Sequence, residues 1–294
     1  MGFGECVFAN WPSCFETYPM ISVLILTYNE QVNIEGCIAS LTWRDDVHVL
    51  DSCSTDKTAE IARALSAKVE IRAFDGYASQ RNAGLSLPFT NEWIVMLDAD
   101  ERMTPELAAE IEREIAAADT NVAMFRVRRR DVFMGRWLRR SSGYPTWFPR
   151  VIRRGRVRVE REINEVYIPD GEAKQLEAHI DHFPFNKGMD WWFDRHNRYS
   201  TMEAQLLIDR KGASSPATKS NDPGARRAAL KALAYRLPLR PYLMFLYLYV
   251  LRGGFLDGMP GWVYANMRLA YEIMIDAKAA YMKSQAGAVD GSTV

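Results

Sequence analysis

The stretch from Trp93 to Glu101 constrains the fold of this chain most strongly, because the apolar run Trp93–Leu97 stops at two carboxylates one residue apart. A run that is almost wholly apolar is typical of a parallel strand that is buried on both faces of its sheet. Such a strand would deliver Asp98 and Asp100 to the carboxyl end of the sheet, where open α/β folds bind ligands. Side chains two residues apart in extended chain point the same way. The pair therefore suits Mg²⁺ or Mn²⁺ held with a ligand's phosphates, although a solvated acidic turn is the ordinary alternative for this motif alone.

Strands and helices alternate through the first part of the chain. The expected strands span 21–26, 47–50, 69–71 and 93–98, and the expected helices start near Asn33, Ala59, Tyr77 and Thr104. Asn33 is the expected N-cap of the first helix, and Thr104, Pro105 and Glu106 read as N-cap, N1 proline and first-turn acid of the fourth. Short connections between alternating strands and helices predict an α/β fold with a doubly wound, mostly parallel sheet.

The polar ends of these strands form a series of motifs. They read Leu26–Glu30 (LTYNE), Leu50–Asp56 (LDSCSTD), Gln80–Asn82 (QRN) and Leu97–Glu101 (LDADE). In order and spacing the series resembles family 2 glycosyltransferases with the GT-A fold, most closely over residues 20–130 and more loosely to about 280. Three later segments are similar to the bacterial branch that acts in lipopolysaccharide core and polysaccharide assembly: Phe148–Arg154, His179–His182 and Gly253–Gly258.

This resemblance implies a nucleotide-sugar site at the strand ends. Its residues would be Thr27, Tyr28, Glu30, Asp51, Arg81 and Asp98. The first loop would contact base and ribose, and Asp51 would accept the imide N–H of the base, usually uracil. Arg81 would approach the diphosphate, because a guanidinium offers paired donors and a fixed charge. For Asp51 and Asp56, an Asx-type cap on the following helix is the alternative interpretation.

The resemblance also implies a Mn²⁺ or Mg²⁺ cofactor bound by Asp98, Asp100 and His182. Asp98 would face the ribose or the metal, and Asp100 would bind the metal that bridges the diphosphate. That metal would neutralise the departing nucleoside diphosphate as a Lewis acid. His182 would complete the metal shell as a histidine does in some relatives, and its alternative is a packed, hydrogen-bonded core residue beside Phe183.

A reaction with inversion also needs a base that deprotonates the acceptor hydroxyl. The segment 160–166 offers Glu165 as this base, so that Glu165 and Asp100 are the predicted catalytic residues. Asn164 falls where the branch often has His. Glu162 is the alternative base in another register, and acids that only balance neighbouring arginines are a further interpretation.

Arginines crowd residues 126–161, interleaved with aromatic side chains that include Trp137 and Trp147. Solvated strand faces explain part of this pattern, and a nucleic-acid surface has the same footprint. The preferred interpretation is a groove for an anionic acceptor, because guanidinium groups bind phosphates in a bidentate way. Trp137 and Trp147 would then stack on a sugar ring, and no nucleic acid is expected.

The chain divides at about residue 188 into a catalytic domain, 1–188, and a helical region, 189–294. A long helix is expected from Met189 to about Arg210, and a loop over 211–226. The apolar run Tyr242–Leu251 is about half as long as a membrane-spanning helix. Arg240 and Arg252 bracket this run, and its tyrosines suit a water–lipid boundary. We interpret it as an interfacial element that docks on the membrane surface; a core helix or a contact in a homo-oligomer is the alternative.

Composition agrees with one large core, because the chain has 294 residues, 48% of them hydrophobic, and a formal net charge of zero. The four cysteines lack paired spacing, so free thiols and a reducing compartment are expected. No secretory signal is evident in the first residues. The expected location is cytoplasmic, peripheral to the inner membrane.

These observations predict a metal-dependent, inverting glycosyltransferase. It would move a sugar from a nucleotide diphosphate-sugar, with a UDP-sugar favoured, to a saccharide or lipid-linked acceptor in cell-envelope glycan assembly. A polyprenyl-phosphate glycosyl synthase, whose phosphate acceptor needs no base, is one alternative. A nucleotide-sugar-binding scaffold without turnover is the other. Dinucleotide-binding and P-loop enzymes are disfavoured, because neither glycine-rich motif is present.

Overall fold

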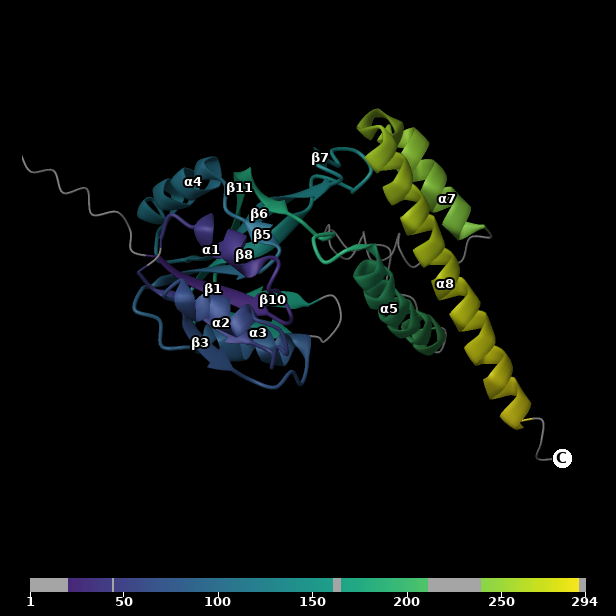
Figure 1. Cartoon of the computed structure of the whole chain (residues 1–294), viewed down its shortest axis with the longest axis horizontal. Helices are drawn as coiled ribbons and strands as arrows, with labels where there is room; N and C mark the ends of the chain where they lie inside the picture. The colour runs from purple at the N-terminus through teal and green to yellow at the C-terminus, as the bar shows by residue number, and fades with distance from the viewer. Residues whose placement is uncertain (1–20, 44, 161–164, 211–238, 291–294) are drawn as a thin grey trace, which may run out of the picture.

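The computed structural model describes residues 21–43, 45–160, 165–210 and 239–290, and the predicted loop 211–226 and both Glu162 and Asn164 lie outside these ranges (Figure 1). The strands are β1 (Ile21–Thr27), β2 (Val47–Asp51), β3 (Lys68–Ile71), β4 (Trp93–Asp98), β5 (Glu101–Arg102), β6 (Val122–Phe133), β7 (Arg136–Trp137), β8 (Trp147–Arg153), β9 (Val157–Glu160), β10 (Val166–Pro169) and β11 (Glu172–His182). The helices are α1 (Ile34–Ala39), α2 (Thr58–Ala64), α3 (Tyr77–Leu85), α4 (Pro105–Ala116), α5 (Met189–Arg210), α7 (Arg240–Leu246), the π-helix η1 (Tyr247–Leu251), the 3₁₀-helix η2 (Gly254–Asp257) and α8 (Met259–Asp290).

The main sheet has the strand order β3-β2-β1-β4-β8-β6-β11-β5, with β7 paired to β6. Strands β1 to β4 are mutually parallel. Strand β8 runs antiparallel between β4 and β6, and β11 is parallel to β6. A separate antiparallel pair, β9 and β10, lies beside α3. The doubly wound, mostly parallel sheet predicted from the sequence is thus confirmed.

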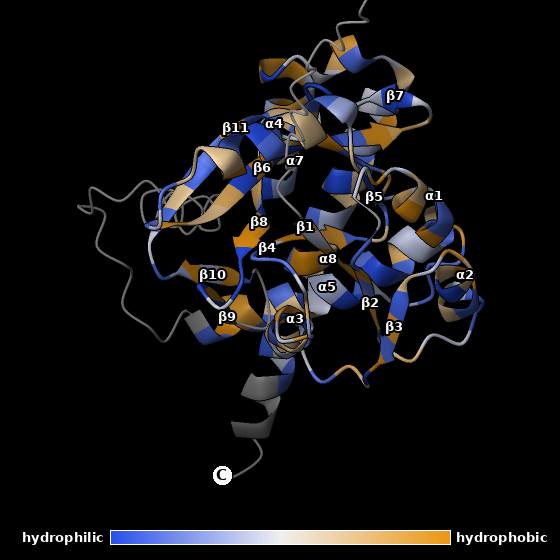
Figure 2. Cartoon of the chain, turned by 90° about the vertical axis from the view of Figure 1, so that its left-hand side faces the viewer, coloured by the Kyte–Doolittle hydropathy of each residue, from blue (hydrophilic) through white to orange (hydrophobic). Residues whose placement is uncertain are grey.

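Helices cover both faces of the central strands, which explains why those strands are mostly apolar (Figure 2). Along β1, Val23 and Ile25 pack in the cluster that contains residues of α1 and α4. Leu24 points to the opposite face, where it packs with Met96 and residues of α3. Successive side chains of a strand alternate between faces. With both faces buried, such a strand is mostly apolar, and its buried polar side chains are hydrogen-bonded, as Ser22 of β1 is to Asp46.

The helix-start predictions met different outcomes. Thr104 caps α4 as predicted, because its hydroxyl accepts a hydrogen bond from the Leu107 N–H at 3.2 Å, and Pro105 follows in the first turn. Asn33 precedes α1 but makes no side-chain cap. Its amide nitrogen instead donates to Glu30 at 2.8 Å, and its amide oxygen accepts from Asn186 at 2.8 Å. Asn33 thus stands at the predicted N-cap position, but its side chain makes no capping hydrogen bond, because Glu30 and the distant Asn186 engage its amide.

A buried carboxylate, Asp46, holds the amino ends of β1, β2 and β3 together. It accepts hydrogen bonds from the Ser22 hydroxyl at 2.5 Å and from the Thr90 N–H at 2.8 Å. Lys68 Nζ lies 2.6 Å and His48 Nε2 2.9 Å from the same carboxylate. Burial alone would raise the pKa of Asp46, but the hydrogen bonds from Lys68, Ser22 and Thr90 hold that pKa well below its usual range.

Replacing Asp46 with Ala is expected to lower the free energy of unfolding by about 3 kcal/mol, because buried donors lose their acceptor. A depressed folded-state pKa adds stability above the unfolded-state pKa and loses it as the pH falls toward the folded value. The wild type should therefore lose stability on acidification below about pH 4 by a larger margin than the variant. Urea denaturation at several pH values measures both effects, with the exposed neighbour Asp45→Ala as control. Equal stabilities of Asp46→Ala and wild type would contradict the assignment.

The C-terminal helices pack on one another and on the far end of the sheet (Figure 1). Helix α5 spans the range predicted for it, and both α5 and α7 pack against α8. One apolar cluster joins Phe133 and Leu138, around β7, to Trp192 of α5 and Met267 of α8. Within the described ranges, no helix combines a bilayer-spanning length with a sufficiently apolar composition.

Two residues of this region have structural roles. Asp257 is buried, and its Oδ2 accepts hydrogen bonds from the Arg140 N–H and from the N–H and hydroxyl of Ser141, at 2.8 to 3.0 Å. Arg240 is only 6% exposed and is paired with Glu272 and Asp276. The prediction that Arg240 marks a membrane boundary was therefore wrong, because its charge is neutralised inside the helical unit.

Candidate functional site

The predicted strand-end residues meet at one edge of the sheet. Thr27 is the register partner of Asp51, and Leu26 is the register partner of Asp98, so adjacent strands present these polar groups side by side. Asp51 is 1% exposed, and its Oδ1 accepts hydrogen bonds from the Thr27 hydroxyl at 2.8 Å and the Ser54 hydroxyl at 2.5 Å. Its Oδ2 accepts from the Ser54 N–H at 2.8 Å. Asp51 thus shapes the turn after β2, and its contact with a base stays a prediction.

The turn after β2 also explains two smaller observations. Cys53 has a φ of 59°, in the left-handed region that favours glycine. Asp56 accepts hydrogen bonds from the N–H and hydroxyl of Thr58 and, at 3.1 Å, from the Gln31 N–H. Asp56 therefore serves the start of α2 and the neighbouring loop, which is the capping interpretation.

The loop after β1 is linked to the segment before α5 by Lys187. Its Nζ lies 2.8 Å from Glu30 Oε1 and donates to the Tyr28 carbonyl at 3.1 Å, while the Trp191 ring covers it at 4.1 Å. Burial and the charge of Asp100 raise the pKa of Glu30, and Lys187 opposes that shift. Tyr28 is 54% exposed, so its ring is accessible to a ligand. Sequence reasoning missed Lys187, because it lies far along the chain in an unremarkable turn.

A single guanidinium connects the predicted nucleotide site to the predicted base. Arg81 of α3 places Nη2 3.2 Å from Asp98 Oδ1 and Nε 3.1 Å from Glu165 Oε1. The second oxygen of Asp98 lies 2.8 Å from Arg150 Nη2. Burial would raise the pKa of Asp98, but Arg81 and Arg150 together hold it well below its usual range. Asp98, Arg81 and Glu165 therefore occupy one ionic network, although they come from three separate elements.

Arg150 supports this network from below. Its guanidinium forms a two-pronged pair with Glu101, at 2.8 and 2.9 Å, and Glu101 is completely buried. Glu101 also accepts a hydrogen bond from the Asp98 N–H at 3.1 Å. A buried bidentate pair of this kind fixes geometry. The sequence contained a signal for Arg150, since it lies in the Phe148–Arg154 segment.

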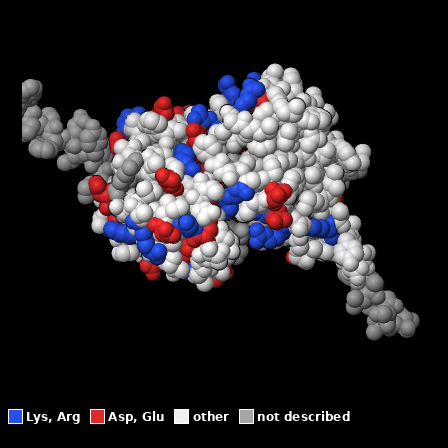
Figure 3. All heavy atoms as spheres, viewed as in Figure 1, with Lys and Arg blue, Asp and Glu red and all other residues white. Residues whose placement is uncertain are grey.

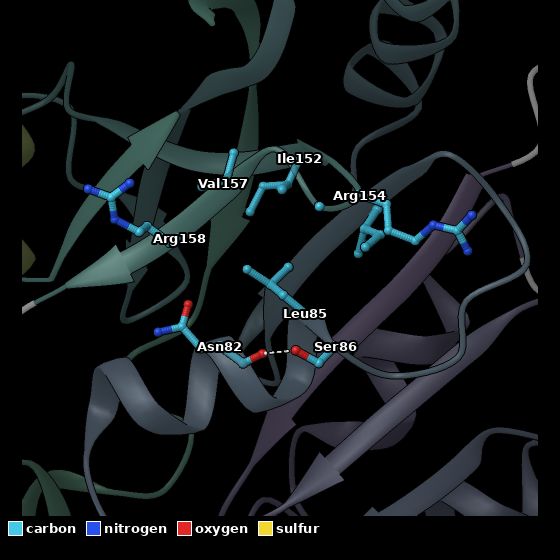
Figure 4. Close-up of a pocket in the computed structure, with 9 residues that line it drawn as sticks. Asn82, Leu85, Ser86, Ile152, Arg154, Val157 and Arg158 are labelled. Atoms are coloured by element: carbon cyan, nitrogen blue, oxygen red, sulfur yellow. Dashed lines mark hydrogen bonds between the residues drawn. The ribbon is translucent and has the colours of Figure 1, made fainter. Parts of the chain in front are cut away.

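Asn82 of the Gln80–Asn82 motif holds β9, which pairs with β10; the two strands lie on either side of the predicted base in the sequence. Its amide donates to the Val159 carbonyl and accepts from the Val159 N–H, each at 2.8 Å. The Asn82 side chain thus hydrogen-bonds to both backbone groups of Val159 in β9. The partner strand, β10, begins one residue after Glu165. Figure 4 shows Asn82 of α3 and Ser86, directly after α3, lining a pocket with Val157 of β9. That pocket is separate from the strand-end carboxylates.

Asp100 faces His182. The His182 Nε2 lies 3.3 Å from Asp100 Oδ2, and His182 Nδ1 donates to Asp131 Oδ1 at 2.7 Å. The strand register explains the arrangement, since His182 on β11 lies opposite Asp131 on β6 and opposite Glu101 on β5. Burial and Arg129 would lower the pKa of His182, but Asp100 and Asp131 raise it to about 9. Asp131 was missed because it follows three arginines and reads as charge balance.

The donor set at Asp100 and His182 fits a divalent cation in part. Two ligands about 2.1 Å from one ion lie roughly 3 Å apart when they occupy adjacent positions, close to the observed 3.3 Å. The described side chains contain no group of three or more His, Cys, Asp or Glu arranged for a metal. Mg²⁺ and Mn²⁺ commonly complete their shells with phosphate oxygens and water. Asp98 is engaged by two arginines, so its role as a metal ligand stays a prediction.

Helix α5 brings two polar side chains, Arg195 and Tyr199, to the site. Arg195 Nε donates to the Tyr199 hydroxyl at 2.9 Å, and that hydroxyl lies 3.0 Å from the hydroxyl of Tyr77 on α3. Burial would lower the pKa of Arg195, whereas Tyr199 and Asp100 raise it. Arg195 thus contributes positive charge near Asp100. Its position could not be predicted, because it depends on how α5 packs over α3.

Several guanidinium groups of the arginine-rich region pair with acidic side chains, among them Arg128 with Glu177 at 3.2 Å and Arg156 with Asp170 at 3.0 Å. A groove for an anionic acceptor in this region stays a prediction. The Trp137 ring stacks on His179 with a centroid distance of 5.9 Å, so this face is already occupied. Stacking of Trp137 or Trp147 on a sugar stays a prediction.

The comparison with protein families decides the identity. The family model described as "Glycosyl transferase family 2" matches residues 22–182, a range that includes the residues from Thr27 to His182 discussed above. The chain belongs to glycosyl transferase family 2. Family membership and the sheet topology confirm the predicted GT-A fold, here with a helical C-terminal extension.

Individual relatives of this glycosyltransferase carry matching names. It is 28% identical over 266 residues to the lipopolysaccharide core biosynthesis glycosyltransferase LpsC of Rhizobium meliloti (strain 1021), an alignment that covers 85% of this chain and 90% of LpsC. An uncharacterized glycosyltransferase of Rickettsia bellii (strain RML369-C) is 44% identical over 93 residues, which is 31% of each chain.

Solved structures align more distantly. The glycosyltransferase aligns with S. aureus TarS 1-349 at a TM-score of 0.44 and 13% identity, over 90% of this chain and 91% of the other. Glucosyl-3-phosphoglycerate synthase from Mycobacterium tuberculosis, crystallised with Mn²⁺ and uridine-diphosphate-glucose, aligns at a TM-score of 0.33 and 23% identity. That alignment covers 38% of this chain and 44% of the other.

Proposed function

We propose that this enzyme transfers a sugar from a nucleotide diphosphate-sugar, with a UDP-sugar favoured, to a hydroxyl of a saccharide or lipid-linked acceptor, with inversion at the anomeric carbon. The observation that carries the proposal is the Arg81 guanidinium, which joins Asp98 at the donor end of the site to Glu165 at 3.1–3.2 Å. A donor-binding carboxylate and a candidate base are thereby held within one network.

The acceptor class rests on the relationship to LpsC, whose name places it in lipopolysaccharide core biosynthesis. A lipid-linked acceptor of this class would lie at a membrane surface. We therefore include the cytoplasmic membrane surface, at its inner-membrane face, among the partners of this enzyme. The catalytic part, 1–188, would then carry the chemistry, and the helical region, 189–294, would carry the docking surface.

In the proposed reaction Glu165 removes the proton from the acceptor hydroxyl. The acceptor oxygen forms a bond to the anomeric carbon while the bond from that carbon to the phosphate oxygen breaks, and the nucleoside diphosphate leaves with the bonding electrons. Arg81 holds Glu165 and Asp98 in register, and Arg195 and Lys187 add positive charge around the donor. Preorganised charge of this kind stabilises a developing anion.

Asp100 and His182 would hold a Mn²⁺ or Mg²⁺ ion, which when bound supplies Lewis-acid stabilisation to the departing diphosphate. Asp131 positions His182, because its carboxylate accepts the hydrogen bond from Nδ1–H and leaves Nε2 directed at Asp100. Carboxylates in this position fix the orientation of metal-binding histidines.

Asp131→Asn is expected to weaken Mn²⁺ affinity about 10- to 100-fold, because the amide orients His182 less firmly. Electron paramagnetic resonance of free Mn²⁺ measures that affinity without relying on activity. Asp181→Asn is the matched control. Asp181 precedes His182 on β11, but its carboxylate pairs with Arg130 and not with His182. An Asp131→Asn protein with wild-type Mn²⁺ affinity would remove His182 from the metal site.

The proposal as a whole is tested by a thermal-shift panel of UDP-, GDP-, dTDP- and CMP-sugars, each with and without Mn²⁺. A ligand that binds only the native state raises Tm by mass action, by an amount set by its concentration relative to Kd. We expect a Mn²⁺-dependent shift with UDP-sugars. No shift with any of these donors would overturn the donor assignment.

A further inference from the structure

A second surface, distant in sequence from the donor site, is unusually apolar. It is formed by α7, η1, η2 and the start of α8, which we call the C-terminal face. Many of its large apolar and aromatic side chains are 45 to 73% exposed, among them Tyr242, Leu246, Leu251, Phe255, Met259 and Trp262. Contiguous apolar surface on this scale is typical of an interaction site.

The C-terminal face is also nearly free of charge. Between Leu239 and Trp262 the sequence has only three charged residues, Arg240, Arg252 and Asp257. Arg240 and Asp257 are 6 and 7% exposed and are engaged by neighbouring groups. Figure 3 shows the broad uncharged area over α7 and the upper part of α8.

Basic side chains lie along one edge of this face. The turn around β7 exposes Arg136, Arg139 and Arg140, and Figure 3 shows basic atoms at that edge. The contact with η2 is close, since a Cβ placed on Gly258 would lie 3.0 Å from Arg136 Nη1 and one on Gly253 would lie 3.3 Å from Arg140 Cδ. The arginines therefore border the apolar residues directly.

We propose that the C-terminal face docks on the surface of an anionic lipid bilayer, with the apolar and aromatic side chains at the acyl boundary and the arginines against headgroup phosphates. Tyrosine and tryptophan favour that boundary, and apolar area combined with basic charge determines the strength of interfacial binding. An isologous contact between two copies would bring like-charged edges into one interface, whereas anionic headgroups complement them. The inference rests on the proposed function only for the lipid-linked acceptor.

Docking would set the position of the donor site relative to the lipid. Asp257 ties η2 to the backbone after β7, and the apolar cluster of Phe133, Trp192 and Met267 ties α5 and α8 to the end of β6. Strand β6 also carries Asp131, which contacts His182. The face and the candidate metal ligands thus belong to one packed unit, so a lipid-linked acceptor would meet the site at a defined height.

The test is flotation of the full-length protein with phosphatidylcholine vesicles, prepared with or without phosphatidylglycerol. We expect Leu251→Glu and Phe255→Glu to weaken vesicle binding about tenfold each. Arg136→Ser and Arg140→Ser should each weaken vesicle binding roughly fivefold. This effect should appear only with anionic vesicles at low salt, because salt screens the attraction between arginine and headgroup charges. Leu65→Glu, at an exposed position after α2, is the control that should bind like wild type.

Each variant is also assayed for the UDP-sugar thermal shift, which should stay at the wild-type value, because these residues lie outside the donor site. If wild-type protein shows no UDP-sugar thermal shift, the proposed function is contradicted. The docking proposal would still be tested by vesicle binding alone. Wild-type protein that fails to float, or that floats equally well with the glutamate variants, would overturn the docking proposal. A dimer in sedimentation that the glutamate variants abolish, without vesicle binding, would assign the face to a second copy instead.

Discussion

Asp100→Asn should lower kcat by about 10³-fold and abolish the Mn²⁺-dependent part of the donor-induced thermal shift. Asparagine preserves the size of the side chain but removes the charge that faces His182 Nε2 at 3.3 Å. Asp131 continues to hold the other nitrogen of His182, so Tm without ligands should change little. Steady-state kinetics with a UDP-sugar, together with Mn²⁺ titration, measure the effect.

The matched control for this variant is Asp190→Asn, an exposed aspartate in the first turn of α5. It removes the same charge from the neighbourhood of the site without touching His182. Wild-type turnover and Mn²⁺ response in the Asp100 variant would show that the metal site is elsewhere. If the Asp100 variant, but not the Asp190 variant, has a lower Tm without ligand, the ion pair between Asp100 and His182 has a structural role instead.

Glu165→Gln should reduce turnover about 10²- to 10⁴-fold while donor affinity stays within about twofold of wild type. The amide oxygen can still accept the hydrogen bond from Arg81 Nε, now at 3.1 Å from the carboxylate, but it cannot take a proton. The defect should therefore appear in kcat rather than in the Kd for the donor. Calorimetric donor binding and single-turnover transfer separate the two quantities.

Glu160→Gln provides the control, because Glu160 is exposed on β9 and pairs only with its neighbour Arg158 among the contacts described for it. An unchanged rate in the Glu165 variant would move the base to another group. It would equally favour a polyprenyl-phosphate acceptor, whose phosphate oxygen attacks without deprotonation. Assaying transfer to a phosphate and to a hydroxyl acceptor in parallel distinguishes these two outcomes.

The layout of the central sheet could be predicted because its signals are local. Apolar runs with polar ends specify β1, β2 and β4, and the helix start at Thr104 follows from the preferences of neighbouring residues. The strand-end positions of Asp51, Asp98 and Asp100 follow from the same pattern, since parallel strands present their carboxyl ends at one edge.

Predictions failed where a distant segment competes for a side chain. Asn33 has a favourable local sequence for capping, yet its amide joins Glu30 to Asn186, which lies more than a hundred residues away. Arg240 flanks an apolar run as an interfacial arginine does, yet Glu272 and Asp276 of α8 enclose it. A helix cap contributes about 1 kcal/mol to stability. Removing one partner of a buried ion pair costs more than that, so the ion pair decides where such a side chain lies.

The amino-acid sequence by itself determined the alternation of strands and helices, the strand-end carboxylates and the family, because each depends on neighbours a few residues apart. Only the tertiary structure decided that Asp131 holds His182 and that Arg81 joins Asp98 to Glu165. The pairing of β6 with β11 changes register by two residues between Gln175 and His179, and this irregularity decides which residue of β6 lies opposite His182. No local pattern encodes that shift, so the partners of His182 emerge only when the two strands meet.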